Sequence, residues 1–175
     1  MPTAPGSRPP GTDALDAIVG QWERERPDLD PVPMALLGRI TRLYWMVDER
    51  LNLVFGRFGL GRGEFDVLGT LRRSGPPFEL TAGELSGSMM VTSGAVTKRV
   101  DRLERAGLVG RRTAEGDARG RLIRLTEEGR ELIDRAVTAH VENERRLVSG
   151  LTAEEQETLS GLLRRLTLTM PDARP

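Results

Sequence analysis

Apolar residues recur at three- and four-residue steps through several segments of this 175-residue chain, which is the period of an amphipathic helix. The pattern predicts a short helix over residues 13–25 and a long helix from about Met34 to Phe58. A third helix is expected over 62–73, before the break at Ser74–Pro77. Residues 1–12 are rich in proline and glycine but lack an apolar run, so we interpret them as a disordered tail and not a signal peptide.

Two helices in the middle of the chain are predicted to be separated by a tight turn. Thr81 and Glu84 have the spacing of a capping box, which indicates the start of a helix of barely two turns. The next helix should begin at Thr92 or Ser93 and run to about Ala106. A helix, a tight turn and a second, basic helix together form the helix-turn-helix pattern.

A pair of short strands is expected directly after the basic helix. Extended patterns cover residues 108–112 and 121–125, and the polar, glycine-containing stretch 113–120 between them is typical of a hairpin loop. A hairpin in this position is a wing. The expected fold is therefore mainly α with a small β wing, in the winged helix-turn-helix class.

Two further helices are predicted at the end of the chain, over about 126–149 and from the capping box Thr152–Glu155 onward. We expect a winged domain over residues 61–126, with N-terminal helices over 13–60 before it and C-terminal helices over 127–175 after it. The terminal helices carry apolar stripes that one small domain cannot cover. A dimerisation domain built from them, in a symmetric homodimer, would bury these stripes.

Charge is concentrated in one segment, although the 26 basic and 26 acidic residues cancel over the whole chain. Residues 91–124 hold nine basic and four acidic residues, so this segment carries +5 and the rest of the chain −5. Phosphate binding depends on where cations gather, which makes double-stranded DNA the expected partner. A symmetric dimer would place two recognition helices about 34–36 Å apart, in successive major grooves of a palindromic site.

The predicted DNA contacts lie on the basic helix and at the tip of the wing. Ser93 and Thr97 are one helical turn apart and would present hydroxyl groups to base edges or phosphates. Lys98 and Arg102 repeat this spacing with charged groups, and Arg119 is placed to enter a minor groove. The alternative for Lys98 and Arg102 is a basic helix face that is simply solvated.

Several classes of protein are disfavoured by composition. The chain has no cysteine, which excludes disulfides, cysteine-based zinc sites and thiol redox sensors. No apolar run of about 18 residues is present, so no transmembrane helix is expected, and a cytoplasmic location follows by default. We find no nucleophile with a partner base, no metal-ligand cluster and no phosphate-binding loop. The sequence therefore predicts neither an enzyme nor a bound metal or cofactor.

Residues 62–130 resemble the MarR family of winged-helix regulators. The resemblance is strongest in VTSGAVTKRVDRLERAGLVGRR and GDARGRLIRLTEEG, which contain an Asp-x-Arg-Gly wing signature at Asp117, Arg119 and Gly120. The stretches QWERERPDLD and GEFDVLGTLRRSGPPFEL are similar to the PecS and urate-responsive branch, which has an extra N-terminal helix, here 13–25. The resemblance implies a DNA-binding transcriptional regulator, by family default a repressor.

The same branch implies a small anionic ligand, with urate as the leading candidate. Its urate-responsive members share four ligand-linked residues, and the matching positions here are Trp22, Asp66, Arg99 and Arg111, the last chosen over Arg112. A flat anion could contact the indole and accept charge-assisted hydrogen bonds from the guanidinium groups. We expect Asp66 to pair with Arg99, and an arriving anion to disturb this pair and move the recognition helix.

Alternatives remain open for the ligand residues and for the function. Trp22 could be only a helix anchor, Asp66 with Arg99 only a structural ion pair, and Arg111 a phosphate contact of the wing. The same fold could sense another anion, such as a tricarboxylate or a phenolic acid. A winged-helix module that binds a protein partner and never contacts DNA is the alternative from a different class.

Overall fold

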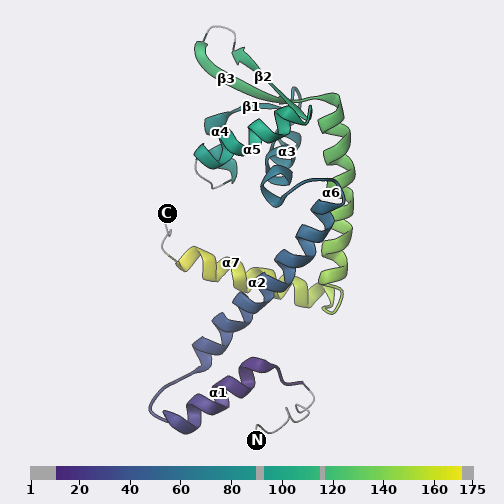
Figure 1. Cartoon of the computed structure of the whole chain (residues 1–175). Helices are drawn as coiled ribbons and strands as arrows, with labels where there is room; N and C mark the ends of the chain where they lie inside the picture. The colour runs from purple at the N-terminus through teal and green to yellow at the C-terminus, as the bar shows by residue number, and fades with distance from the viewer. Residues whose placement is uncertain (1–10, 90–92, 115–116, 171–175) are drawn as a thin grey trace, which may run out of the picture. The chain divides into compact units, whose positions relative to one another are not determined.

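The computed structural model describes residues 11–89, 93–114 and 117–170, with the side chains of residue 93 and of residues 113–120 outside this description (Figure 1). The chain divides into two compact units between Glu49 and Arg50. Most described residues are helical and three short strands form one sheet, which confirms the predicted fold class. None of the helices in the described part is long and apolar enough to cross a membrane.

The first unit contains helix α1 (Ala14–Glu25) and the beginning of helix α2 (Val32–Gly56). Asp13 caps α1 and also binds Arg39 of α2, with 2.8 Å between Oδ2 and Nε. This hydrogen bond from Arg39 lowers the pKa of the Asp13 carboxyl to about 2. Leu15 lies against Gly38, where an added Cβ would meet its Cδ1 at 2.6 Å. Charge pairing and close apposition therefore hold α1 on α2.

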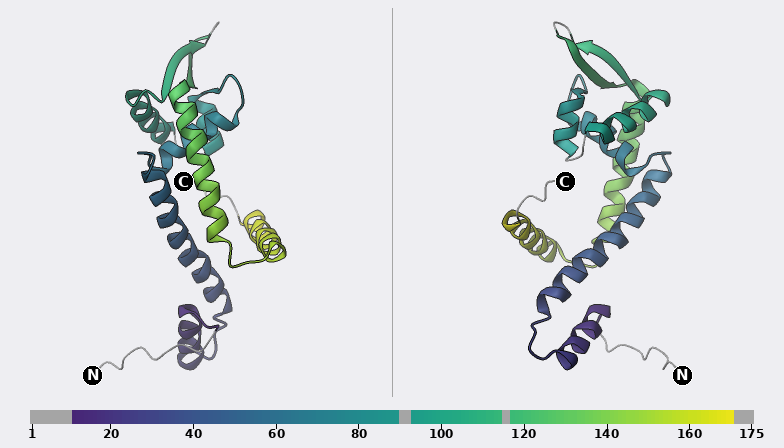
Figure 2. Two further views of the ribbon diagram at one scale, coloured as in Figure 1. Left: turned by 90° about the vertical axis from the view of Figure 1, so that its right-hand side faces the viewer. Right: turned by 60° about the vertical axis from the view of Figure 1, so that its left-hand side comes forward.

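The second unit is built around helices α3 (Arg62–Arg73), α4 (Ala82–Met89) and α5 (Ser93–Arg105), which lie close together beside the sheet in both views of Figure 2. Each helix contributes fully buried leucine or valine side chains to one core. The buried residues of this helical core include Val67, Leu68, Leu71, Leu85, Val96, Val100 and Leu103. The Thr81–Glu84 capping box predicted at the start of α4 is confirmed by both of its hydrogen bonds, at 2.7 and 3.2 Å.

The sheet consists of β1 (Glu79–Thr81), β2 (Val109–Ala114) and β3 (Asp117–Leu125), antiparallel in the order β1-β3-β2. The prediction of a hairpin loop over residues 113–120 was wrong, because both strands continue into this range. Only residues 115–116, which lie outside the described residues, separate the two strands. The hydrogen bonds between paired strands are made by the backbone, so a ladder can continue through polar residues with no apolar pattern.

Helix α6 (Glu127–Leu147) packs against α3, and helix α7 (Ala153–Thr169) follows it. Ile133 and Ala136 of α6 are fully buried, and Asp134 binds Arg72 of α3, with 2.7 Å between Oδ1 and Nε. No residue of α7 is buried in the single chain.

Large apolar side chains remain exposed on both terminal parts of the chain. The α2 segment of the first unit exposes Val32, Met34, Leu36, Leu37, Leu43, Tyr44, Trp45 and Met46, and α7 exposes Leu159, Leu162, Leu163 and Leu168. Leu168 is 79% exposed and Trp45 66%. A monomer therefore leaves the predicted apolar stripes in water. The unfavourable free energy of this exposure grows with the exposed apolar area.

We predict that Gly129→Ala destabilises the fold, because a Cβ at Gly129 would lie 2.0 Å from the backbone oxygen of Leu108. Backbone atoms cannot move aside as a flexible side chain can, so the expected loss is about 1–3 kcal/mol of unfolding free energy. Urea unfolding followed by circular dichroism would measure it. Gly69→Ala is the matched control: a Cβ there meets no atom within 4 Å, so this variant should be neutral or more stable. Equal stability of the two variants would contradict this account of the α6 junction.

Candidate nucleic-acid interface

Helix α5 is held in the second unit by one apolar face and exposes polar side chains on the opposite face. Val96 and Val100 are fully buried and Leu103 is 2% exposed, at the four- and three-residue steps of one helical stripe. Thr97 and Lys98 lie on the exposed side. Because α4 precedes α5 and the β2–β3 hairpin follows it, α5 has the position of the recognition helix in a winged helix-turn-helix.

The residues predicted to contact DNA fall into two groups. Thr97, Lys98 and Arg102 are on the described, exposed part of α5, and the Arg102 side chain is 67% exposed. Ser93 begins α5 and Arg119 belongs to β3, but both side chains lie outside the described residues. The described three thus share one helix surface.

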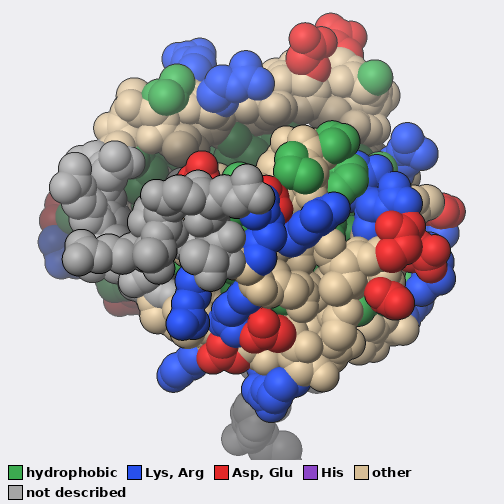
Figure 3. Space-filling model, turned by 90° about the horizontal axis from the view of Figure 1, so that it is seen from above, with side chains coloured by type: hydrophobic (Ala, Val, Ile, Leu, Met, Phe, Trp, Pro, Cys, Tyr) green, Lys and Arg blue, Asp and Glu red, His purple; other side chains and the backbone are tan. Residues whose placement is uncertain are grey.

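Positive charge gathers on the side of the molecule that Figure 3 shows, where Lys and Arg side chains are interspersed with acidic ones. The exposed basic residues described between residues 91 and 124 are Lys98, Arg102, Arg105, Arg112, Arg121 and Arg124. The two acids of residues 91–124 whose side chains are described, Asp101 and Glu104, both pair with Arg111. The pairs determine which guanidinium groups can reach a ligand.

Arg111 and Arg112 occupy opposite faces of β2, as the two-residue period of a strand requires. Arg111 is in register with the buried Ile123 and therefore points to the side of α5. Its Nη2 lies 2.5 Å from Oδ1 of Asp101, and its Nη1 binds Glu104, so two acids of α5 hold one guanidinium of the wing.

Arg112 is directed to the other face of the sheet, where it binds Glu79 of β1. Both carboxylate oxygens take part, at 3.0 Å from Nε and 2.5 Å from Nη2. The pair reaches across β3, the central strand, and ties the two outer strands together. Of the two candidate arginines, Arg111 alone is thus joined to the recognition helix by a described ion pair.

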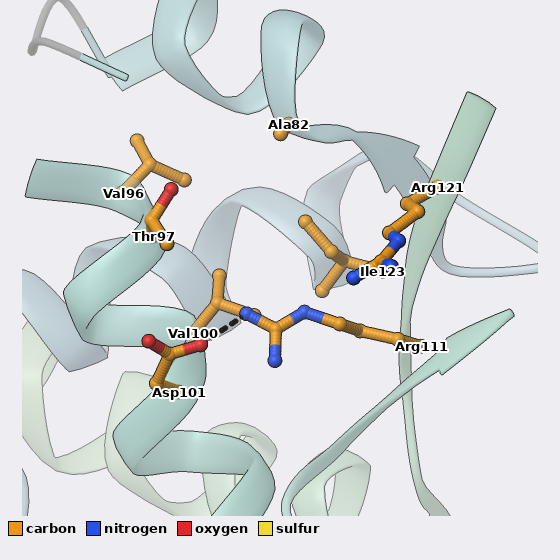
Figure 4. A pocket seen from close by; sticks show the side chains of 8 residues that line it. All are labelled: Ala82, Val96, Thr97, Val100, Asp101, Arg111, Arg121 and Ile123. Atoms are coloured by element: carbon orange, nitrogen blue, oxygen red, sulfur yellow. Dashed lines mark hydrogen bonds and ion pairs between the residues drawn. The ribbon is translucent and has the colours of Figure 1, made fainter. Parts of the chain in front are cut away.

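A pocket of about 270 Å³ lies between α5 and the wing (Figure 4). Its lining comprises Ala82, Val96, Thr97, Val100, Asp101, Arg111, Arg121 and Ile123. Arg111 extends from β2 across the pocket toward Asp101, and Arg121 enters from β3 beside Ile123 (Figure 4). A mostly apolar lining with two guanidinium groups can accept a small planar anion. An anion bound there would compete with Asp101 for Arg111.

Arg99 lies on a different side of α5, against the first turn of α3. An added Cβ at Gly63 would lie 2.2 Å from Nε of Arg99, so the absence of a side chain at Gly63 makes room for the guanidinium group. Nη1 of Arg99 is buried and has no hydrogen-bond partner among the residues that the structure describes. An unpartnered buried guanidinium nitrogen is uncommon and is suited to an anionic ligand.

The prediction of an ion pair between Asp66 and Arg99 was wrong, since no ion pair joins these two described residues. Asp66 is half-buried on α3, three residues after Gly63. Trp22 is 40% exposed on α1, in the first unit. Arg99 contacts α3 whereas Arg111 contacts the acids of α5, and no described contact brings Arg99 and Arg111 together.

Four acids with structural roles at this interface were missed at the sequence level: Glu64, Glu79, Asp101 and Glu104. Asp101 and Glu104 are two of the four acids in the charge balance of residues 91–124. Their three-residue spacing, which places both on one side of a helix next to a basic strand, was the available signal. No group of three or more His, Cys, Asp or Glu among the described residues could hold a metal ion.

Comparison with known proteins gives one consistent family. Residues 58–120 match the model of the MarR family. The chain is 44% identical over 149 residues to the HTH-type transcriptional regulator PecS of Dickeya dadantii (strain 3937), covering 85% of this chain and 90% of PecS.

Two solved structures of similar proteins contain DNA. A point mutant of MarR from E. coli, complexed with operator DNA, has a TM-score of 0.67 at 28% identity, covering 83% of this chain and 96% of that one. Sco3205, a MarR family regulator from Streptomyces coelicolor in complex with DNA, has a TM-score of 0.73 at 26% identity, covering 82% of this chain and 91% of that one.

We predict that the Glu79–Arg112 pair makes the stability of the winged unit depend on pH. The hydrogen bond from Arg112 holds the pKa of the Glu79 carboxyl below its usual range. The pair therefore stabilises the fold at pH values above the unfolded pKa of about 4.3, and this stabilisation is lost as the pH falls through the folded pKa. The advantage of the wild type over Glu79→Gln should thus be full near neutral pH and shrink in acid.

Urea midpoints measured by circular dichroism from neutral pH down to about pH 3, below the usual range for a glutamate, would test this. Glu128→Gln is the control, because Glu128 is exposed and has no ion pair with a described residue. A difference between wild type and Glu79→Gln that stays constant over this range would refute the role of the pair.

Proposed function

The chain belongs to the MarR family of transcriptional regulators, and we propose that it acts as a homodimeric repressor that leaves a palindromic operator when a small anion binds. That it is a DNA-binding regulator of the MarR and PecS type, and not an enzyme, follows from the family. The dimer, the repression, the ligand and the individual contact residues are our proposals.

The DNA contacts are proposed on the exposed surface of α5 and on the wing. Thr97, Lys98 and Arg102 are exposed on α5, opposite the buried stripe that fixes its orientation. Lys and Arg would neutralise phosphates, and the hydroxyl of Thr97 could contact a phosphate or a base edge. Ser93 and Arg119 are proposed contacts from the sequence. The observation that carries the proposal is the exposed, basic face of a helix directly before a wing.

The homodimer is proposed from the uncovered apolar residues of α2 and α7. A stable monomer rarely exposes so many large apolar side chains, and a second copy is the partner that a palindromic operator requires. A symmetric pair would also set the two copies of α5 at the spacing of successive major grooves.

The ligand is proposed to act through Arg99 and Arg111, with contributions from Asp66 and Trp22. Nη1 of Arg99 is buried without a hydrogen-bond partner in the described part of the chain, and Arg111 already shares its charge with Asp101 and Glu104. An anion that binds the guanidinium group of Arg111 would withdraw it from the acids of α5. The recognition helix would lose its tie to the wing, a local charge change that moves a DNA-binding element.

Urate is the anion we propose first, because a flat, charged heterocycle can accept parallel hydrogen bonds from a guanidinium group and lie against the indole of Trp22. Asp66 would then respond to the charge of the bound anion. Other planar anions share part of this chemistry, so the experiment below includes them as competitors.

We expect urate to release DNA from the wild-type protein in a fluorescence anisotropy titration with labelled DNA from upstream of its own gene. Arg99→Ala and Asp66→Asn should still bind DNA but lose this release, and Arg111→Ala should respond at least about tenfold more weakly. Arg112→Ala is the matched control, because it removes a neighbouring arginine that is directed to the other face of the sheet.

Tight, salt-sensitive DNA binding with no response to urate would reject the ligand and keep the regulator. Release by citrate or salicylate at lower concentrations than urate would replace the ligand with a tricarboxylate or a phenolic acid. Absence of DNA binding at low salt would reject the operator-binding role itself.

We also predict that the protein sediments as a dimer, at about twice the 19.3 kDa of the chain, in analytical ultracentrifugation at micromolar concentration. The complex with a palindromic DNA should contain two chains per duplex. A 19.3 kDa species that binds DNA with one chain per duplex would contradict the proposed assembly.

A further inference from the structure

Glu64 is a buried acid at the start of α3 that lies directly behind the recognition helix. Only 7% of the residue is exposed. One carboxylate oxygen, Oε2, accepts a hydrogen bond of 2.6 Å from the backbone N–H of Gly61, so Glu64 closes the first turn of α3.

The other oxygen of Glu64 is directed to α5. Oε1 lies 3.0 Å from Nε of Arg102, an ion pair between residues 38 positions apart in the sequence. The two side chains differ sharply in exposure: Glu64 has 8% of its side chain exposed and Arg102 has 67%. A fixed, buried carboxylate thus holds the inner end of a guanidinium group whose outer end is in solvent.

This contact leaves the two terminal nitrogens of Arg102 available. Neither donates a hydrogen bond to any residue that the structure describes. The guanidinium group is planar, so an ion pair at Nε restricts the plane in which the Nη1 and Nη2 hydrogens lie. A bidentate contact to a phosphate requires this presentation, and an arginine that is already ordered loses less side-chain entropy when it binds.

We propose that Glu64 is a positioning residue for DNA binding, which orients Arg102 toward a backbone phosphate although Glu64 has the same sign of charge as DNA. The proposal rests on the DNA contact proposed above for Arg102. It runs against simple electrostatics, by which removing an acid near the DNA should strengthen binding. The favourable effect of ordering Arg102 outweighs that repulsion, because Glu64 is buried and its charge is shared with Arg102 and the Gly61 N–H.

Glu64→Gln is a suitable test because it separates the two contacts of this side chain. Glutamine can still accept the Gly61 hydrogen bond, as it does in other capping boxes, so α3 should keep its first turn. The negative charge that holds Arg102 is lost. We expect DNA binding to weaken by about three- to tenfold, with the thermal midpoint little changed.

Two controls distinguish positioning from general effects of charge or folding. Glu128→Gln removes the same charge from an exposed side chain that has no ion pair with a described residue, and it should bind DNA as well as or slightly better than the wild type. In an Arg102→Ala background, Glu64→Gln should have no further effect, because the residue it orients is absent.

The measurement is fluorescence anisotropy with one labelled operator duplex at several salt concentrations, for the wild type, both single variants, the double variant and Glu128→Gln. If Arg102 contacts a phosphate, the slope of log affinity against log salt should fall by about 0.9 in Arg102→Ala. Glu64→Gln should lower the affinity and leave the Arg102→Ala value unchanged in the double variant.

The outcomes separate the two proposals. Weaker binding of Arg102→Ala together with wild-type binding of Glu64→Gln would overturn the inference and keep the DNA contact. Additive losses in the double variant would likewise overturn it, since Glu64 would then act independently of Arg102. Wild-type binding by Arg102→Ala would overturn the proposed contact and the inference together.

Discussion

The structure of the winged unit depends on how helix α5 is embedded. Val96, Val100 and Leu103 form a stripe that is almost completely buried, and this stripe anchors α5 to α3, α4 and the sheet. Burying one face fixes the rotation of the helix about its own axis, and therefore which side chains face solvent. These three apolar residues therefore determine which way the proposed DNA contacts face, namely Thr97, Lys98 and Arg102.

Charged pairs hold α5 from two sides around this apolar stripe. On one side Glu64 of α3 binds Arg102, and on the other Asp101 and Glu104 bind Arg111 of the wing. These acids thus have a structural role in addition to balancing charge. Each engages one arginine at the edge of the interface, which orders that side chain and connects α5 to a neighbouring element. The local excess of positive charge still remains to attract DNA.

The same arrangement suggests why a small anion could control DNA binding. A guanidinium group that is shared between carboxylates of α5 is one that a competing anion can capture, whereas the Arg112–Glu79 pair only joins strands of the sheet. In the proposed switch the apolar stripe keeps the unit folded while the ionic ties change. Ligand binding and folding would then be nearly independent, because folding depends on the apolar stripe and the ligand response depends on the ion pairs.

The sequence by itself determined the helices, the capping boxes and the order of helix, turn, helix and wing, because these follow from local periodicity and from hydrogen bonds between residues three or four positions apart. Strand alternation also separates Arg111 from Arg112 once the strand is recognised. The exact ends of β2 and β3 were not predictable, since the ladder extends through polar residues that show no apolar alternation.

Only the tertiary structure decided which acid meets which arginine. Glu64 and Arg102 are 38 positions apart, and Glu79 and Arg112 are 33 apart, so no local spacing encodes either pair. The expected partner of Arg99 was Asp66, yet the guanidinium lies against Gly63, where the missing Cβ leaves room for it. Long, flexible charged side chains take whichever partner the packed backbone brings within reach, and that packing is set by apolar contacts elsewhere in the unit.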